Sequence, residues 1–488
     1  MRTKKIVLSL VALLLFVSVP LPTAAVTPYE GYNYSYYGYA VPSPSGYLPS
    51  VSYNGNALGV GSFNQPNDLF VAPSGHIYIL DSGNKRIVHL DENWNVVRTI
   101  DSFDNNGITD GFSAPSGIFV TNAGIIYVAD TEKRRVVILS EEGRLIRTIE
   151  NPQSDILPSD FTFYPLKLTV DYADRVYVVA RGVFEGIMQF DEKGEFLGYV
   201  GTNKVRPGFG DYIWKLLATR EQRERMVLFI PSEFSGVDID ERGFVYATNV
   251  DPGSNEPVKR LNPSGEDILK RHGYFGVIGD VQYDELGANR GPSRFIDITV
   301  HGTGMYSVLD AQRGRIFTYD DEGKLLYVFG GVGNQLGVFR TPVALTYVGD
   351  RIAVLDRGRN RIVVFEPTAF GQAVNSAIGM QAEGKVEEAV RHWREALRLN
   401  ANFEIAYIGI GKAYLMERRN KEAMEYFKLG MNRKYYSTAF KRYRKDVVRE
   451  HFGTAMNVLL LLVIGFAGYR TFKKYRSRRV RTNETISG

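Results

Sequence analysis

The chain has 488 residues, a formal net charge of +5 and no cysteine, which excludes disulfide bonds, thiol catalysis and thiolate metal sites. Its positive charge lies at the ends: the first 25 residues carry +3 and the last 19 carry +6, which leaves −4 for everything between them. This distribution gives no electrostatic case for nucleic-acid binding.

Residues 1–25 are typical of a secretory signal peptide. Three basic residues precede an apolar stretch at 6–19, and small residues at 23–25 offer a cleavage point. An uncleaved membrane anchor is the alternative. The next segment, 26–46, is rich in Tyr, Gly, Ser and Pro, and we expect it to be a flexible leader with no core of its own.

A sequence motif that starts with an aromatic residue and a proline recurs along the chain. Its first copy reads Phe63, Pro66, then the strand Ile77–Asp81, then Arg86. Matching strands end at positions 81, 130, 180, 249, 310 and 356, so the steps run from 46 to 69 residues. Each step holds apolar runs of period 2 separated by Gly, Asn and Asp, which fits a blade of about four short strands. The six copies predict a mainly β fold, a six-bladed β-propeller.

The ends of the repeat region indicate how the ring closes. The last copy stops near Phe365, before its outermost strand, and the segment 55–63 resembles 333–339, which follows an outer strand. We therefore expect residues near Tyr47–Tyr53 to supply the missing strand of the last blade, and the propeller to span 47–370. Closure of this kind leaves only short, protected sheet edges.

Over about residues 47–366 these motifs resemble the NHL-repeat family of β-propellers, most clearly in four of the six copies. The resemblance implies a binding platform. Some six-bladed relatives are enzymes, among them metal-dependent lactonases and a lyase that works with channel metals. An extracellular metal-dependent hydrolase or lyase of this lactonase-like type is therefore the alternative function.

Four copies carry an aspartate five residues before an arginine. The aspartate ends one strand and the arginine opens the next, so an Asp that bonds backbone amides two residues on, and an Arg that pairs with it, would fix the turn. A ring of carboxylates that binds a cation is the alternative. The structural pairs are Asp81/Arg86, Asp130/Arg135, Asp310/Arg315 and Asp356/Arg361.

Two copies lack the aspartate, and Ala180 and Asn249 stand in its place. The longest step lies between them and contains a predicted short helix at Asp211–Met226 with a charged run. An insertion on a regular scaffold is a candidate binding region, and irregularity that a robust ring tolerates is the alternative. The candidate binding residues are Trp214, Arg220, Arg223 and Asn249.

The sequence predicts no catalytic residue, no cofactor and no metal ligand. The four histidines of the propeller do not share one blade position, and there is no nucleophile elbow, phosphate loop or zinc-protease motif. The carboxylate pair Asp238/Asp240 has a strand context that is common in propellers. A divalent cation such as calcium in the channel is a further option that no residue pattern supports.

After the propeller the apolar period changes to 3.6. Residues 371–450 resemble tetratricopeptide repeats, because small and aromatic residues recur 34 apart, as in Ala389/Ala423 and Trp393/Phe427. A stalk that spaces the propeller from the membrane and a peptide-binding groove are the two roles considered. A helix near residues 435–449 is expected to cap the repeats.

Residues 452–469 carry no charge and are long enough to cross a bilayer as a helix. Seven Lys or Arg residues follow in the tail, 470–488, which predicts a cytoplasmic C-terminus and a propeller outside the cell membrane. The sequence thus predicts a single-pass, extracytoplasmic scaffold that binds a protein or carbohydrate, or an accessory subunit of a membrane transport or envelope assembly. Its expected partners are the membrane, an extracellular or envelope ligand and membrane-complex subunits, with no nucleic acid.

Overall fold

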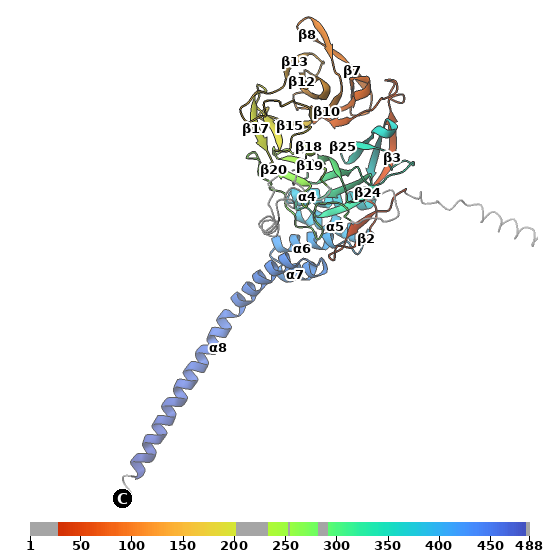
Figure 1. Ribbon diagram of the computed structural model, residues 1–488. Helices are drawn as coiled ribbons and strands as arrows, with labels where there is room; N and C mark the ends of the chain where they lie inside the picture. Colours follow the sequence, from red (N-terminus) through yellow and green to blue (C-terminus); the bar gives the residue numbers. More distant parts are fainter. Residues whose placement is uncertain (1–27, 202–232, 252–253, 282–290, 485–488) are drawn as a thin grey trace, which may run out of the picture. The chain divides into compact units, whose positions relative to one another are not determined.

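β-Strands dominate the chain as far as Pro367, and helices follow (Figure 1). The computed structural model describes residues 28–201, 233–251, 254–281 and 291–484. The chain divides into two compact units, Met1–Glu383 and Gly384–Gly488.

Six antiparallel sheets follow one another along the first unit, and each is one blade of a β-propeller. Blade one consists of β4 (Asp68–Val71), β5 (Ile77–Asp81), β6 (Arg86–Leu90) and β7 (Val96–Ile100). Blade two consists of β10 (Pro115–Val120), β11 (Ile126–Asp130), β12 (Arg135–Leu139) and β13 (Leu145–Ile149). Blade three consists of β14 (Pro165–Val170), β15 (Val176–Ala180), β16 (Ile187–Phe190) and β17 (Phe196–Val200). Blade four consists of β18 (Phe234–Ile239), β19 (Val245–Asn249) and β20 (Val258–Leu261). Blade five consists of β21 (Phe295–Val300), β22 (Tyr306–Asp310), β23 (Arg315–Tyr319) and β24 (Leu325–Gly330). Blade six consists of β25 (Pro342–Val348), β26 (Arg351–Asp356), β27 (Arg361–Pro367) and β3 (Tyr47–Asn54). The predicted six-bladed propeller is confirmed.

The ring closes where the sequence predicts it. Strand β3 pairs antiparallel with β27, with Val51 opposite Val364 and Asn54 opposite Arg361. In Figure 1 the red β3 lies beside the cyan strands of the last blade. The outermost strand of blade six therefore comes from the start of the chain, and this pairing covers the edge that β27 would otherwise expose.

The hydrophobic core lies between neighbouring blades. The second strand of blades one to five is buried along its whole length, because blades pack against both of its faces. One cluster joins Tyr78 and Leu80 of blade one to Ile118 and Val128 of blade two. These strands are therefore mostly apolar, whereas in the outer strands β7, β13 and β17 only the last residue is buried.

Turns between the second and third strands explain the recurring aspartate and arginine. Lys85, Arg134 and Asn360, each four residues after the aspartate, adopt left-handed φ angles of 55°, 56° and 49°. The 3₁₀ turns that they end are η1 (Ser82–Asn84), η2 (Thr131–Lys133) and η3 (Arg357–Arg359). The arginine that follows opens the third strand.

The buried aspartates bond backbone amides, but mainly not those two residues on. Asp81 accepts from the Asn64 amide at 2.7 Å, and Asp356 accepts from the Thr341 amide at 2.9 Å. In the same way Asp130 accepts from the connection that enters its own blade. The aspartate therefore ties the end of the second strand to the segment 15 to 17 residues earlier. Rules for turn residues consider only neighbours within a few positions, so they do not predict this contact.

Three of the arginines lie next to their aspartates at increasing distance. Nε to Oδ2 is 2.8 Å for Arg86 and Asp81, 3.3 Å for Arg135 and Asp130, and 4.0 Å for Arg361 and Asp356. Blade five departs from the predicted pair. Arg315 Nη1 pairs with Asp280, and Asp310 accepts instead from Ser293 Oγ and the Arg294 amide at 2.8 Å each.

The leader expected to be flexible packs on blade five. It forms a hairpin of β1 (Tyr32–Tyr34) and β2 (Ala40–Pro42), whose Asn33 Nδ2 donates to the carbonyls of Leu325 and Leu326 at 3.0 and 3.2 Å. The Tyr34 ring stacks on Phe275 with centroids 3.9 Å apart. We call residues 28–54, which comprise this hairpin and β3, the N-terminal arm. The leader packs Tyr34 into the hydrophobic core of blade five.

A buried carboxylate holds the arm in place. The hydroxyls of Tyr32 and Tyr34 both donate to Asp280 Oδ1 at 2.7 Å, while Arg313 and Arg315 approach Oδ2. Burial raises the pKa of Asp280, but the Arg315 charge and the two hydroxyls outweigh burial and leave the pKa below its usual value. Asp280 has no role in the sequence prediction, because the two tyrosines that donate to it lie 248 and 246 residues earlier in the chain.

Five helices follow the propeller. The first, α4 (Ala369–Ala382), is capped by Thr368 Oγ1, which accepts from the Gly371 amide at 3.0 Å. The second unit contains α5 (Val386–Leu399), α6 (Glu404–Met416), α7 (Asn420–Leu429) and α8 (Arg433–Glu484). Here a Cβ on Gly409 would lie 2.3 Å from Trp393, and one on Gly411 would lie 2.7 Å from Phe427. The aromatics that recur 34 apart thus occupy helix contacts that glycine makes possible.

Helix α8 contains two elements that were predicted as separate helices. The capping helix near 435–449 and the apolar segment 452–469 form one helix of 52 residues, since no proline interrupts the chain between them. By length and composition this helix can cross a membrane. Its apolar side chains are exposed, with Leu461 68% exposed.

Candidate functional site

Charged side chains from the innermost strands of blades one, three and five converge at the centre of the propeller. Asp68, Lys167 and Asp297 pair with Leu80, Val179 and Leu309, the residues that directly precede the recurring aspartate position. They therefore hold the same register place in blades one, three and five. Blades two, four and six hold small residues at this place: Gly117, Gly236 and Ala344.

The small residues let neighbouring inner strands approach closely. A Cβ on Gly117 would lie 2.5 Å from the Leu166 carbonyl oxygen, and one on Gly236 would lie 2.6 Å from the Asp297 Cα. Because real Cβ atoms do not approach backbone this closely, larger residues would push the inner strands apart. The alternation of small and charged residues thus lets three long side chains meet in the channel.

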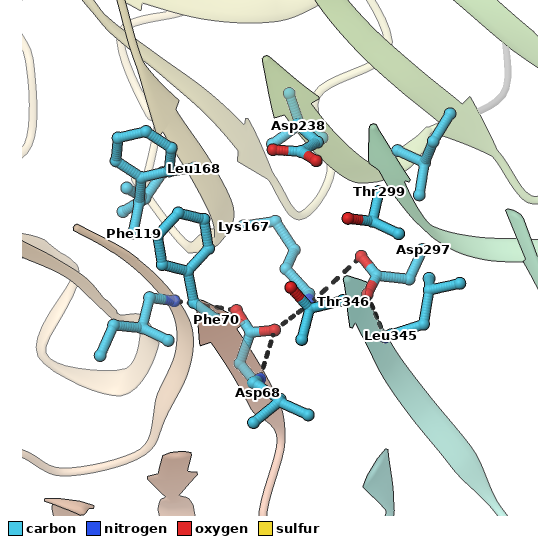
Figure 2. Close-up of a pocket in the computed structure, with 14 residues that line it drawn as sticks. Asp68, Phe70, Phe119, Lys167, Leu168, Asp238, Asp297, Thr299, Leu345 and Thr346 are labelled. Atoms are coloured by element: carbon cyan, nitrogen blue, oxygen red, sulfur yellow. Dashed lines mark hydrogen bonds and ion pairs between the residues drawn. The ribbon is translucent and has the colours of Figure 1, made fainter. Parts of the chain in front are cut away.

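Lys167 links two aspartates across the channel (Figure 2). Its Nζ lies 2.5 Å from Asp68 Oδ1 and 3.4 Å from Asp297 Oδ1. The second oxygen of each carboxylate accepts a backbone N–H from the next blade: Ile118 for Asp68 and Leu345 for Asp297, both at 2.9 Å. We call these three residues the channel triad. Each aspartate therefore joins adjacent blades as well as the lysine.

Burial and neighbouring charges shift the pKa values of Lys167 and Asp297. Burial lowers the pKa of Lys167, but Asp297 and Asp68 outweigh it and raise that pKa to about 12. Burial raises the pKa of Asp297 to about 6, against the opposing charge of Lys167. At neutral pH the channel therefore holds an ammonium between carboxylates, and the lysine supplies the positive charge that a bound cation would otherwise supply.

Asp238 lies on the innermost strand of blade four, two residues after Gly236, and also lines the channel cavity. Its Oδ1 accepts from the Ile239 amide and its Oδ2 from the Val300 amide, each at 2.9 Å. Burial raises the pKa of Asp238 by more than these hydrogen bonds lower it, and the pKa is about 7. The surrounding cavity, which Phe70 and Phe119 also line, has a volume of about 30 Å³ for the centre of a water molecule. It has room for water, whereas pockets for organic ligands are about ten times larger or more.

Asp238 makes the stability of the propeller depend on pH. In the unfolded chain its pKa is about 3.9, so between pH 4 and 7 the folded protein binds a proton that the unfolded chain has released. The contribution of Asp238 to the free energy of unfolding is therefore expected to fall by about 3 kcal/mol as pH rises from 5 to 8. Chemical unfolding of wild type and Asp238→Asn at both pH values measures this. The Asn variant should show a flatter pH dependence, and an equal dependence in both proteins would contradict the assignment.

The channel triad was missed in the sequence, although a signal for it exists. In blades one and three the charged residue stands two places after the proline of the repeat: Pro66 precedes Asp68, and Pro165 precedes Lys167. Aligning this place across the six copies gives Asp, Gly, Lys, Gly, Asp and Ala. The recurring motif lies on the second strands, which are structural, whereas the first strands face the channel.

The predicted binding region is described only at Asn249. Its Oδ1 accepts from the Asp251 amide and its Nδ2 donates to the Glu256 carbonyl, both at 3.3 Å. These contacts hold a local turn, and Asn249 does not line the channel cavity. The other candidates, Trp214, Arg220 and Arg223, lie outside the described residues, as do the helix Asp211–Met226 and the signal peptide 1–25.

A second cluster lies on one face of the ring. In each four-stranded blade the strands alternate in direction, so the blade begins and ends at the same face of the ring, which we call the connection face. On it the half-buried Tyr164 has the guanidinium groups of Arg134 and Arg181 over its ring, each 5.3 Å from the centroid. Both arginines are exposed. Arg181 Nη1 lies 3.7 Å from Glu132 Oε1, which is a long and exposed ion pair. This arginine–tyrosine patch is therefore open to a ligand.

Comparisons with known proteins support the repeat. The NHL repeat family model matches residues 63–90, which make up most of blade one. A search of curated proteins by sequence gives no match.

Similar solved structures include virginiamycin B lyase from Staphylococcus aureus, at 12% identity and a TM-score of 0.39, covering 64% of this chain and 98% of that one. A protein of unknown function from Bacteroides thetaiotaomicron gives 14% identity and a TM-score of 0.41 over 63% and 70% of the two chains. A gluconolactonase candidate gives 12% and 0.39 over 67% and 93%. At such scores these similarities say nothing about what this chain binds or catalyses.

Proposed function

We propose that this protein is a single-pass membrane protein whose propeller lies outside the cytoplasm and binds a protein partner of the cell envelope through its connection face. The observation that carries the proposal is the arginine–tyrosine patch formed by Arg134, Tyr164 and Arg181. Tyrosine and arginine are enriched among the residues that contribute most to protein interfaces.

The patch is suited to binding because its geometry is fixed from beneath. The Arg181 amide donates to the Tyr164 carbonyl at 2.9 Å, and Arg134 follows the 3₁₀ turn η2 in a left-handed conformation. A rigid aromatic between two exposed cations favours a partner that offers a carboxylate and an apolar side chain. Little ordering entropy is then lost when the partner binds.

The alternative, a metal-dependent hydrolase or lyase, finds less support in the channel. Its carboxylates Asp68 and Asp297 already pair with Lys167, and the cavity that they line has room for water rather than for an organic substrate. Among the described residues, Asp238 with a pKa of about 7 and Asp297 with a pKa of about 6 favour acid–base chemistry there. The channel triad favours the scaffold over this enzyme.

The C-terminal elements support the anchored arrangement. Helix α8 is long and apolar enough to cross a bilayer, and its C-terminal end is rich in Lys and Arg, which favours a cytoplasmic tail. Before the apolar stretch, α8 extends about 18 residues, or about 27 Å. We assign α5–α7 to tetratricopeptide-like repeats that serve as a spacer at the membrane.

Crosslinking from the connection face tests the proposal. A photoreactive amino acid placed at position 164 of the full chain, in cells that make the protein, should crosslink to one defined envelope protein. The same probe at Tyr172, which is 69% exposed in the turn between β14 and β15 on the opposite face, is the control and should not capture that protein. Adding Arg134→Ala and Arg181→Ala to the 164 probe should weaken the crosslink several-fold, because each guanidinium contributes about 1 kcal/mol or more at an interface.

Crosslinks that are equal from positions 164 and 172, or absent from 164, would contradict binding through this face. A crosslink from 164 that persists unchanged after both arginines are removed would show that the patch is not the contact. Release of a carbohydrate polymer rather than a protein from the crosslinked material would replace the proposed partner by a glycan.

A further inference from the structure

Two histidines that are separated in the sequence meet at the boundary between blades one and two. His76 lies in the turn between β4 and β5, and His89 lies in β6; His76 Nδ1 and His89 Nε2 are 2.8 Å apart. Glu141, in the turn between β12 and β13 of blade two, completes a group whose ligand atoms all lie within 4.8 Å of one another. The sequence predicts no metal ligand, because the propeller histidines do not share one blade position, yet two of them lie side by side in the structure.

The burial of the three side chains is graded, as an accessible metal site requires. His89 is fully buried, His76 is half-buried and Glu141 is exposed, so an ion can enter from solvent. His89 is held rigidly: the Tyr78 ring stacks on it with centroids 4.3 Å apart. Its other nitrogen, Nδ1, has no hydrogen-bond partner among the described residues. The buried imidazole thus has its partner on one side only, and that side faces His76.

Neutral imidazole is the form that binds a metal. Burial, with the nearby His76 and Arg98, lowers the pKa of His89 to about 4, so this ring is neutral at physiological pH. Arg98 lies opposite His89 on the neighbouring strand β7. Its charge adds to the effect of burial on His89, but it also opposes a bound cation, while Glu141 favours one. Binding is therefore expected to be moderate rather than as tight as in a structural zinc site.

We propose that His76, His89 and Glu141 bind a divalent transition-metal ion of the zinc type, with water as the fourth ligand. Two imidazoles and one carboxylate are a known zinc donor set, and they leave one coordination position open. Nitrogens on a tetrahedral zinc lie about 3.3 Å apart, so the pair at 2.8 Å must open by about half an ångström. The half-buried His76, in a turn, can make this movement. The bound ion would crosslink the turns of blades one and two.

Zinc titration of the full-length protein in detergent tests the site. Wild type should bind one zinc ion that His76→Ala weakens roughly tenfold or more and Glu141→Gln weakens by a similar factor. Both substitutions are at accessible positions in turns, so neither is expected to prevent folding. His272→Ala removes a propeller histidine outside the group and should leave zinc affinity unchanged.

Cobalt provides a second readout, because its visible spectrum reports the coordination geometry. Wild type loaded with Co²⁺ should show the intense absorption of a tetrahedral site, and His76→Ala should lose it. Absence of zinc binding by wild type would overturn the proposal. Equal zinc affinity and equal cobalt spectra in wild type and His76→Ala would overturn it as well, since any bound ion would then lie elsewhere.

Discussion

A chain that begins at residue 55 is expected not to fold its propeller cooperatively, whereas a chain that begins at residue 26 should fold. The deletion removes β3, which completes blade six, and with it Tyr47, which is fully buried. It also removes Tyr34, which stacks on Phe275. Loss of one buried aromatic side chain costs about 3–5 kcal/mol, and a whole domain is stable by only about 5–15 kcal/mol. Circular dichroism melting and limited proteolysis of both chains in detergent measure the effect.

A chain that begins at residue 43 separates the two parts of the N-terminal arm. It keeps β3 but lacks the β1–β2 hairpin, so the ring still closes while Asp280 loses the hydroxyls of Tyr32 and Tyr34. We expect it to fold with a lower melting temperature. If the chain that begins at 55 melts at the same temperature as the one that begins at 26, closure by β3 contributes nothing to stability and that part of the account is wrong.

Replacing Lys167 by Met is expected to destabilise the propeller by about 3–5 kcal/mol at pH 7.5. The substitution keeps the length of the side chain but leaves Asp68 and Asp297 buried in one channel without a counter-charge. Removing one partner of a buried ion pair costs about this much, because the remaining charge is neither solvated nor paired. Denaturant unfolding at constant pH measures the change.

Two comparisons keep this prediction specific to the channel triad. Adding Asp297→Asn to Lys167→Met should restore part of the lost stability, because one of the two unpaired charges is then gone. Lys193→Met, in the exposed turn of the same blade, should change stability by less than about 0.5 kcal/mol. A Lys167→Met protein as stable as wild type would show that the triad is solvated and not a buried ion pair.

The sequence contains enough to predict the ring but not its centre. The Tyr-Asp strands repeat in register, and the likeness of 55–63 to 333–339 locates the closing strand, because closure is a property of the repeat itself. Lys167 and Asp68 are 99 residues apart and lie in blades that are not neighbours, so their contact depends on the curvature of the whole ring. Local periodicity contains no such information.

Departures from the repeat were harder to interpret than its regular copies. Arg315 follows the pattern in sequence yet pairs with Asp280, since the N-terminal arm brings two tyrosines to that carboxylate and concentrates hydrogen bonds on it. His76 and His89 fall at different blade positions, and they meet because one ends a turn and the other ends a strand on the same side of blade one. Both cases depend on tertiary contacts between segments that the pattern treats independently.

The central claim is that the Lys167 ammonium occupies the channel in place of a metal ion, and calcium titration of thermal stability tests it most directly. Saturating calcium should leave the melting temperature of the wild-type propeller unchanged. In Lys167→Met it should raise that temperature, because Asp68, Asp297 and Asp238 then face one another without a cation. A calcium-dependent rise in wild type that Asp297→Asn abolishes would contradict the claim and restore a metal to the channel.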